Sequence, residues 1–259
     1  MSRRDTFNQV ARLYDEVRPG YSSQLYKDLL AYTNLTKKAK LLEIGCGTGQ
    51  ATLPLAKEGF DILCLEKGSA LANVAKEKLH PYKNVRIIAT SFEEYELQKN
   101  YFDLVFAATS FHWIDPDIKY KKSSRVLKTG GTLAVFWNKH IKNDNWPDDK
   151  FFEEVQTIYQ KFAPELVNLS NPMDEERNSN KKAVSTGLFT EPMSYRYLWT
   201  EIYSAEKYIK LLNTYSDHLT LEHEQRMKLY DSIRALINLK FNGKITKHYE
   251  TILNLVKSR

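Results

Sequence analysis

Apolar runs alternate with amphipathic stretches through the first half of the chain. Runs of five to seven residues rich in leucine, isoleucine, valine and phenylalanine have the length of buried strands, and the segments between them carry apolar residues at helical spacing. This alternation predicts a parallel sheet with helices on both faces. The predicted strands cover residues 40–45, 61–66, 85–89, 102–108 and 131–137, and the predicted helices cover residues 49–57, 69–79 and 116–128.

Polar and small residues mark the ends of these helices. Ser69 is expected to cap the second helix, because a serine hydroxyl accepts a hydrogen bond from an unpaired amide of the first turn. Asp115 and Pro116 are expected to open the third helix, and Gly130-Gly131 to close it.

Two helices are predicted before the first strand. Apolar residues at helical spacing between Phe7 and Val17 predict an amphipathic helix over residues 5–17, which stops before Arg18-Pro19. A second helix is expected to begin after Ser22 or Ser23 and to end near Asn34.

The regular alternation breaks after the fifth strand. We predict a helix over residues 150–163 and a polar loop over residues 168–182. Alternation at Tyr195, Tyr197 and Trp199 predicts a sixth strand. Ser204 is expected to cap a helix that runs to Tyr215. A further helix is predicted over residues 222–239, and a last strand over residues 245–256.

Three alternating glycines follow the first predicted strand, at Gly45, Gly47 and Gly49. Glycine lets a ligand lie against bare backbone at the edge where a parallel sheet binds its ligands. Gln50 stands where a dinucleotide-binding turn has its third glycine, and no Gly-Lys-Ser/Thr follows, so neither a dinucleotide turn nor a phosphate-binding loop is expected. Glu43 would repel a phosphate and suits a cation or an ammonium group.

Glu66 ends the second predicted strand, where a carboxylate can accept hydrogen bonds from both hydroxyls of a ribose. The turn from Glu43 to Gly49 resembles the first motif of the class I S-adenosylmethionine-dependent methyltransferases. The resemblance continues from Tyr14 to Asn138, and it is strongest to the small-molecule branch of trans-aconitate methyltransferase-like proteins, also called methyltransferase type 11. The segments that carry it further are Thr90 to Tyr95, Phe102 to Phe106, Phe111 to Trp113 and Leu127 to Leu133.

The resemblance implies an α/β fold with a Rossmann-like seven-stranded sheet that is mostly parallel, with helices on both faces, an antiparallel last strand and helical cap insertions. It also implies a division of one domain, 1–259, into an N-terminal lid (1–37), a cofactor-binding core (38–140), a cap (141–190) and C-terminal strands and helices (191–259). The implied cofactor is S-adenosylmethionine. The residues expected to bind it are Tyr14, Arg18, Glu43, Gly45, Cys46, Gly47, Gly49, Glu66, Lys67, Ser91, Phe92 and Thr109.

Some of these assignments carry a specific expectation. Ser91 stands where an aspartate is common in the family, and its hydroxyl and backbone are expected to bind the adenine. Arg18, in the segment Arg18-Pro19-Gly20-Tyr21, suits a carboxylate because its guanidinium donates two parallel hydrogen bonds. The alternative for Arg18 is a surface arginine on a packing helix.

His112 and Trp113 follow the fourth predicted strand, which faces the transferred methyl group in this fold. His112 is the candidate catalytic residue, as a base for a hydroxyl or as a group that orients a carboxylate. Trp113 and Tyr21 are the candidate substrate contacts. The alternative is a packed histidine beside a core tryptophan. The remaining histidines lack the spacing of metal ligands, and no metal is expected.

The amino-acid composition and the net charge limit the expected cellular location and the expected classes of binding partner. Hydrophobic residues make up 42% and charged residues 27% of 259 positions, without a membrane-length apolar segment or a signal sequence, so we expect a cytoplasmic, soluble protein that does not bind a membrane. The net charge of +6 is spread among acidic residues, so nucleic acid is not an expected partner. Cys46 and Cys64 are expected to be reduced and buried. Nothing in the sequence indicates the oligomeric state.

We therefore expect methyl transfer to the carboxylate or hydroxyl of a small molecule by in-line displacement. The alternatives are an RNA or protein methyltransferase, and a protein that binds S-adenosylmethionine without turnover. A nicotinamide-dependent oxidoreductase is disfavoured by Gln50.

Overall fold

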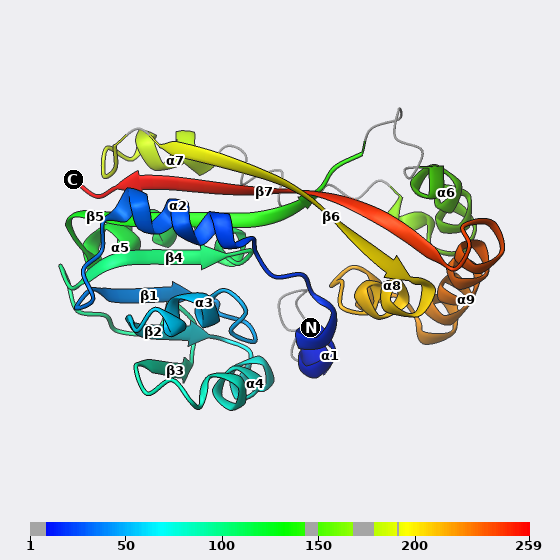
Figure 1. Cartoon of the computed structure of the whole chain (residues 1–259), viewed down its shortest axis with the longest axis horizontal. Coiled ribbons are helices and arrows are strands. Elements are labelled where there is room, and N and C mark those ends of the chain that lie inside the picture. The colour runs from blue at the N-terminus through cyan, green and yellow to red at the C-terminus, as the bar shows by residue number, and fades with distance from the viewer. Residues whose placement is uncertain (1–8, 143–149, 168–178, 191) are drawn as a thin grey trace. The chain divides into compact units, whose positions relative to one another are not determined.

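The computed structural model describes residues 9–142, 150–167, 179–190 and 192–259. Its seven strands form one sheet in the order β3-β2-β1-β4-β5-β7-β6 (Figure 1). The neighbouring pairs from β3 to β5 are parallel, and β7 runs antiparallel to its neighbours. The expected fold class, including the antiparallel last strand, is confirmed. The strands are β1 (Lys40–Ile44), β2 (Asp61–Glu66), β3 (Val85–Ala89), β4 (Phe102–Ala108), β5 (Leu127–His140), β6 (Met193–Ser204) and β7 (Lys244–Lys257).

Contacts between Cα atoms divide the chain into two compact units. The sheet unit comprises Gly20–Asn138, Asn171–Tyr197 and Thr251–Arg259, and the helical unit comprises Met1–Pro19, Lys139–Ser170 and Leu198–Glu250. The helical unit is thus built from three segments, one of which overlaps the expected cap.

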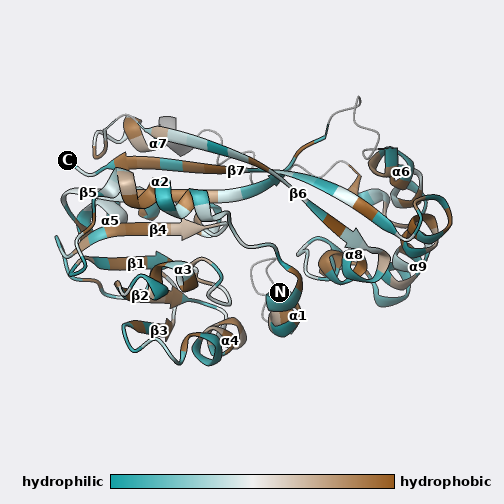
Figure 2. Ribbon diagram, in the orientation of Figure 1, coloured by the Kyte–Doolittle hydropathy of each residue, from teal (hydrophilic) through white to brown (hydrophobic). Residues whose placement is uncertain are grey.

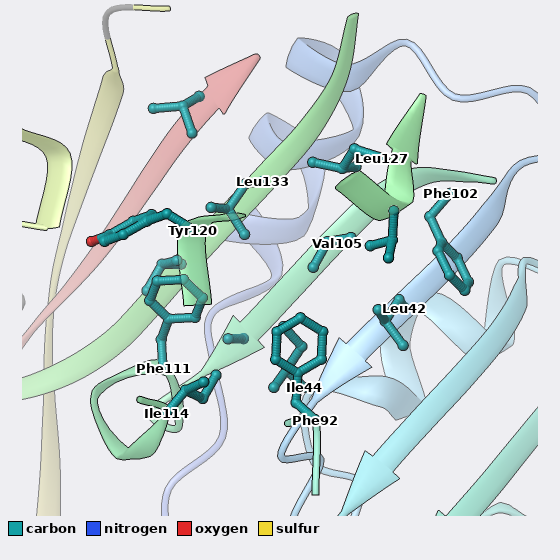
Figure 3. Packing of buried hydrophobic residues seen from close by; sticks show 14 of the residues in the cluster. Leu42, Ile44, Phe92, Phe102, Val105, Phe111, Ile114, Tyr120, Leu127 and Leu133 are labelled. Atoms are coloured by element: carbon teal, nitrogen blue, oxygen red, sulfur yellow. The ribbon is translucent and has the colours of Figure 1, made fainter. Parts of the chain in front are cut away.

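Alternate residues of the central strands face opposite sides of the sheet unit. Leu42 and Val105 belong to the cluster on one face, with residues of α5 (Pro116–Val126) and α7 (Ser179–Ser185), as Figure 3 shows for the strand and α5 side chains. Leu41 and Leu104 belong to the cluster on the other face, with residues of α2 (Ser23–Thr33), α3 (Thr52–Lys57) and α4 (Ser69–Leu79). Figure 2 shows hydrophobic residues along β4 and along the C-terminal part of β7.

The helical unit has its own apolar cluster. Helix α9 (His223–Lys240) packs against α6 (Lys150–Phe162) and α8 (Ala205–Leu212), and α1 (Ala11–Val17) packs against α8. Short 3-10 turns η4 (Pro164–Leu166) and η7 (His218–Thr220) complete the described elements of this unit. Residues 5–8 of the first predicted helix lie outside the described residues.

Several helix boundaries differ from the sequence prediction: the helix predicted over residues 49–57 begins at Thr52, and the one predicted to run to Tyr215 ends at Leu212. The N-cap of α4 is Gly68 and not Ser69, and no side chain caps this helix. Helix α5 ends at Val126, and Leu127 already has extended backbone angles and begins β5. The register of β4 and β5 shifts between Phe102 and Leu104, so Gly130-Gly131 lies within an irregular part of β5 and does not close the helix.

The polar stretch predicted as a loop also differs. Residues 179–185 form α7, so the prediction of a loop was wrong for residues 179–182. Residues 168–178 lie outside the described residues. Ala183 of α7 is buried in the apolar cluster of the sheet unit, together with Phe189 just after the helix. No helix among the described residues has both the length and the hydropathy needed to cross a bilayer.

The central position of β4 gives a stability prediction. Leu104 is fully buried and Leu198 is 71% exposed. We expect Leu104→Ala to lower the free energy of unfolding by about 2–5 kcal/mol, because it removes apolar burial and leaves a cavity. Leu198→Ala, the same chemical change at a solvated site, should stay within about 0.5 kcal/mol of the parent. Urea unfolding followed by circular dichroism measures both values, and equal effects would contradict the assigned core.

Candidate functional site

The glycine turn after β1 has a left-handed backbone. Gly45, Gly47 and Gly49 have φ values of +67°, +56° and +80°, which side-chain-bearing residues rarely adopt. A Cβ on Gly45 would lie 2.7 Å from Ser110 Cβ, and one on Gly49 would lie 2.7 Å from a methyl carbon of Leu79. These two glycines are therefore needed for packing beneath the turn.

Gly47 differs from the other two glycines. A Cβ at Gly47 would meet no atom within 4 Å, so the backbone there borders open space. Its amide donates a 2.8 Å hydrogen bond to Oε2 of Glu66, and Oε1 of the same carboxylate accepts a 2.8 Å bond from the amide of Gly68. Glu66 thus joins the turns that follow β1 and β2.

Glu43 lies beneath this turn and is completely buried. Thr52 Oγ1 donates a hydrogen bond to its Oε2, whereas no hydrogen-bond partner of its Oε1 is found among the described residues. Burial raises the pKa of Glu43 to about 8, despite the opposing hydrogen bond from Thr52. The carboxyl is therefore mostly protonated at neutral pH, and it does not supply the negative charge that the sequence suggested.

The two cysteines lie near this carboxyl, and the Cys64 sulfur is 3.9 Å from Glu43 Oε2. Both are free and buried, as expected. A hydrogen bond with Cys64, together with burial, raises the pKa of the Cys46 thiol well above its ordinary value. Such a thiol stays protonated and has little nucleophilic character.

The segment after β4 lies against the glycine turn. The Ser110 hydroxyl donates a hydrogen bond to the carbonyl of Ile44, the residue before Gly45. Thr109 has a positive φ of 56°, unusual for a side-chain-bearing residue, and its hydroxyl is 2.7 Å from that of Tyr21. Sequence reasoning missed Ser110, because a serine after a strand carries no spacing signal for a partner 66 positions away.

His112 and Trp113 form the 3-10 turn η2 (Phe111–Trp113) directly after this segment. Both side chains are half-buried, and their ring centroids are 4.7 Å apart at a tilt of 45°. The structure therefore brings Tyr21, Thr109, His112 and Trp113 to the carboxyl end of β4, next to the end of β1 that carries the glycines.

Three predicted cofactor residues have other surroundings. The Ser91 hydroxyl donates to Oε2 of Glu94 at 2.9 Å and accepts from the amide of Glu94, so it closes a local turn. Phe92 is 1% exposed and points into the core beside Ile44 (Figure 3), so its side chain is a packing residue. Lys67 follows Glu66 and is exposed. The Ser91 hydroxyl therefore already forms hydrogen bonds within the turn, and its expected contact with the adenine stays a prediction.

Tyr14 and Arg18 belong to the helical unit. Arg18 donates from Nε to the Thr214 hydroxyl and from Nη2 to the Thr214 carbonyl, both at 2.8 Å. Its guanidinium carbon lies 5.0 Å from the ring centroid of Tyr14 and 4.6 Å from that of Tyr215. The sequence did not indicate these partners, because Thr214 lies 196 positions away.

Comparisons with known proteins agree with this architecture. Residues 42–135 match the family described as a methyltransferase domain. An uncharacterized methyltransferase of Mycobacterium tuberculosis is 26% identical over 91% of this chain and 88% of its own length. Malonyl-[acyl-carrier protein] O-methyltransferase 1 of Ilyobacter polytropus is 30% identical over 51% of each chain.

A solved structure shares the fold over the whole chain. It is phosphoethanolamine N-methyltransferase 2 of Haemonchus contortus in complex with phosphomonomethylethanolamine and S-adenosylhomocysteine. It has a TM-score of 0.56 and 19% identity, and the match covers 100% of this chain and 61% of that chain. No group of side chains suited to a metal ion occurs among the described residues.

The buried Glu43 gives a pH prediction. A pKa of about 8 in the folded protein, against 4.5 ordinarily, means that the folded state holds a proton that the unfolded chain releases. Stability from this group is present at low pH and is lost as the pH rises from about 4.5 to about 8.

We expect the stability difference between the parent and Glu43→Gln to change by about 1.4 kcal/mol per pH unit within this window, in the direction that favours the parent at lower pH. Urea unfolding between about pH 5.5 and 7.5 measures it. Glu222→Gln, the same change at an exposed carboxylate, is the control and is measured over the same pH range. A flat difference for Glu43→Gln would show that Glu43 is ionised in the folded protein.

Proposed function

We propose that this chain, an S-adenosylmethionine-dependent methyltransferase of the class I fold, transfers the methyl group to a small molecule. The proposed acceptor group is a carboxylate or a hydroxyl. The observation that carries the proposal is the open backbone at Gly47 beside the Glu66 carboxylate. The end of β4, with its hydroxyl and ring side chains, adjoins the same turn.

The residues present fit the adenosyl cofactor. Space above Gly47 admits a ligand against the backbone, and a Cβ at that position would fill it. The two Glu66 oxygens accept the amides of Gly47 and Gly68, which places the carboxylate beside the open backbone, where an acidic side chain can bind the hydroxyls of a ribose. The backbone of Ser91 and Phe92 is the proposed neighbour of the adenine, and Lys67 of the ribose.

When bound, S-adenosylmethionine supplies a methyl group on a positively charged sulfur. The task of the protein is to align the acceptor oxygen with that methyl group and to exclude water. We assign alignment to Tyr21 and Thr109, whose hydroxyls are joined, and water exclusion to Trp113. His112 orients a carboxylate acceptor, or accepts the proton of a hydroxyl acceptor.

An oxygen acceptor on a small molecule is supported by two observations. One relative is named as an O-methyltransferase, although it shares only about half of the chain. Among the described residues, many lysines are paired with acids, such as Lys40 with Asp61 and Lys240 with Glu154, and do not form an unpaired basic stripe of the kind that binds nucleic acid. The cytoplasmic location and the role of residues 141–190 as a cap remain predictions.

The first test of this proposal is a turnover assay. Purified protein with S-adenosylmethionine should release S-adenosylhomocysteine when carboxylic acids and phenols are added, and mass spectrometry should find the methylated acceptor. Methylation of transfer or ribosomal RNA in place of small molecules would contradict the proposed acceptor class. Binding of S-adenosylmethionine with no turnover on any acceptor of the panel would favour the non-catalytic alternative.

A matched pair of glycine variants tests the cofactor site. Gly47 and Gly59 both have positive φ, and a Cβ at either would meet nothing within 4 Å. Each alanine variant should lose about 1–2 kcal/mol of stability from the left-handed backbone. Only Gly47→Ala should also weaken S-adenosylhomocysteine binding, by at least about tenfold, because its methyl group occupies ligand space. Calorimetry measures this, and equal affinities for the two variants would move the cofactor away from Gly47.

A further inference from the structure

The turn after β3 is held only weakly by its own residues. The Tyr95 amide donates to the carbonyl of Ser91 at 3.2 Å, and the Glu94 amide donates to the Ser91 hydroxyl at 3.3 Å. Both distances lie at or beyond the upper end of the usual range for an N–H···O hydrogen bond, about 2.7–3.2 Å. The shorter bond, from the Ser91 hydroxyl to the Glu94 carboxylate at 2.9 Å, involves an exposed side chain. The conformation of the turn therefore depends on contacts from elsewhere in the fold.

A buried lysine of α5 supplies such contacts. Lys122 is 8% exposed, and its Nζ donates to the carbonyl of Glu93 at 3.0 Å and to that of Tyr95 at 2.8 Å. The same Nζ lies 5.2 Å from the ring centroid of Phe92. One ammonium group thus contacts three residues of a turn that lies 27 or more positions earlier in the chain.

The buried position disfavours the charged form of this lysine. Burial lowers the pKa of the Lys122 ammonium, the Glu96 and Glu93 carboxylates oppose this effect, and the charge of Arg125 adds to it. An uncharged side chain of similar length would pack in the same place without this cost, but it would offer no donor to the two carbonyls. The ammonium therefore contributes the fixed position of the turn backbone.

Helix α5 connects this turn with the segment after β4. Lys119, three positions before Lys122 and on the same face of the helix, is also buried, and its Nζ lies 5.1 Å from the ring centroid of Phe111 in η2. Phe111 and Phe92 belong to the same apolar cluster (Figure 3). One face of α5 therefore contacts both the proposed adenine turn and the turn that carries the candidate catalytic residue, all within the sheet unit.

We propose that Lys122 is a positioning residue for the cofactor. Its ammonium holds the turn over residues 91–95 in the conformation in which the backbone of Ser91 and Phe92 meets the adenine. This inference rests on the proposed function, and it names the residue on which recognition of the base depends. Glu66 is bonded to the turns after β1 and β2, so the proposed ribose contact does not require Lys122.

A base analogue tests the proposal. S-Inosylhomocysteine differs from S-adenosylhomocysteine only in the base, where a carbonyl replaces the 6-amino group and the adjacent ring nitrogen carries a proton, so hydrogen-bond donors and acceptors are exchanged. In calorimetry the parent should bind S-adenosylhomocysteine at least about tenfold more tightly, because a fixed backbone cannot pair with the exchanged pattern. Equal affinities would mean that the turn does not recognise the base, and the proposal would be wrong.

Variants of Lys122 should change this preference. Lys122→Met removes the donors and keeps the length of the side chain. It should weaken S-adenosylhomocysteine binding at least about tenfold and S-inosylhomocysteine binding less, so that the preference falls below about threefold. Lys122→Arg should retain the preference, because a guanidinium also supplies several donors. Lys121→Met, at the exposed neighbour on the same helix, should match the parent. An unchanged preference in Lys122→Met would overturn the inference.

Leu104→Ala separates positioning from general stability. Leu104 and Phe92 belong to the apolar clusters on opposite faces of the sheet, so this change weakens the sheet without altering the turn. The ratio of the two affinities should therefore stay at the value of the parent. A ratio that falls in Leu104→Ala as far as in Lys122→Met would assign the effect to lost stability and would refute a positioning role.

Hydrogen exchange tests the turn without any ligand. Peptides that cover residues 90–96 should exchange faster in Lys122→Met than in the parent, whereas peptides from β1 should exchange alike, which also shows that the variant folds. Equal exchange of the turn in both proteins would contradict the inference. Failure of the parent to bind S-adenosylhomocysteine would instead overturn the proposed function, and with it the role assigned to Lys122, whatever the exchange result.

Discussion

The candidate cofactor site depends on one carboxylate that joins two backbone turns. Glu66 accepts from the amide of Gly47 with one oxygen and from the amide of Gly68 with the other, both at 2.8 Å. Because β1 and β2 are parallel neighbours, their carboxyl ends meet at one edge, and a side chain at the end of β2 reaches the turn after β1. The amides of Gly45 and Cys46 also donate to the carbonyl of Leu65, so contacts from the end of β2 fix the position of the glycine turn.

The same contact explains why part of the site could be predicted from the sequence. Strand length, the glycine spacing and the acid at the end of β2 are local features, and the strands and the positive φ angles agree with them. Ser69 was wrong as a helix cap, because the N-cap of α4 is Gly68, whose amide donates to the Glu66 carboxylate two positions earlier. The partner of the other Glu66 oxygen, the amide of Gly47, lies 19 positions away, and local propensity cannot anticipate it.

Electrostatics was the least predictable property. Glu43 has the sequence signature of a charged residue beside a ligand, yet its burial leaves it mostly protonated at neutral pH. Lys247 belongs to no sequence motif, and the fold brings its Nζ to the hydroxyl of Tyr215, 32 positions away. The guanidinium of Arg18, near the start of the chain, lies over the ring of the same tyrosine. Charge in a sequence is a formal quantity, whereas the charge that a ligand meets depends on burial and on partners distant in the chain.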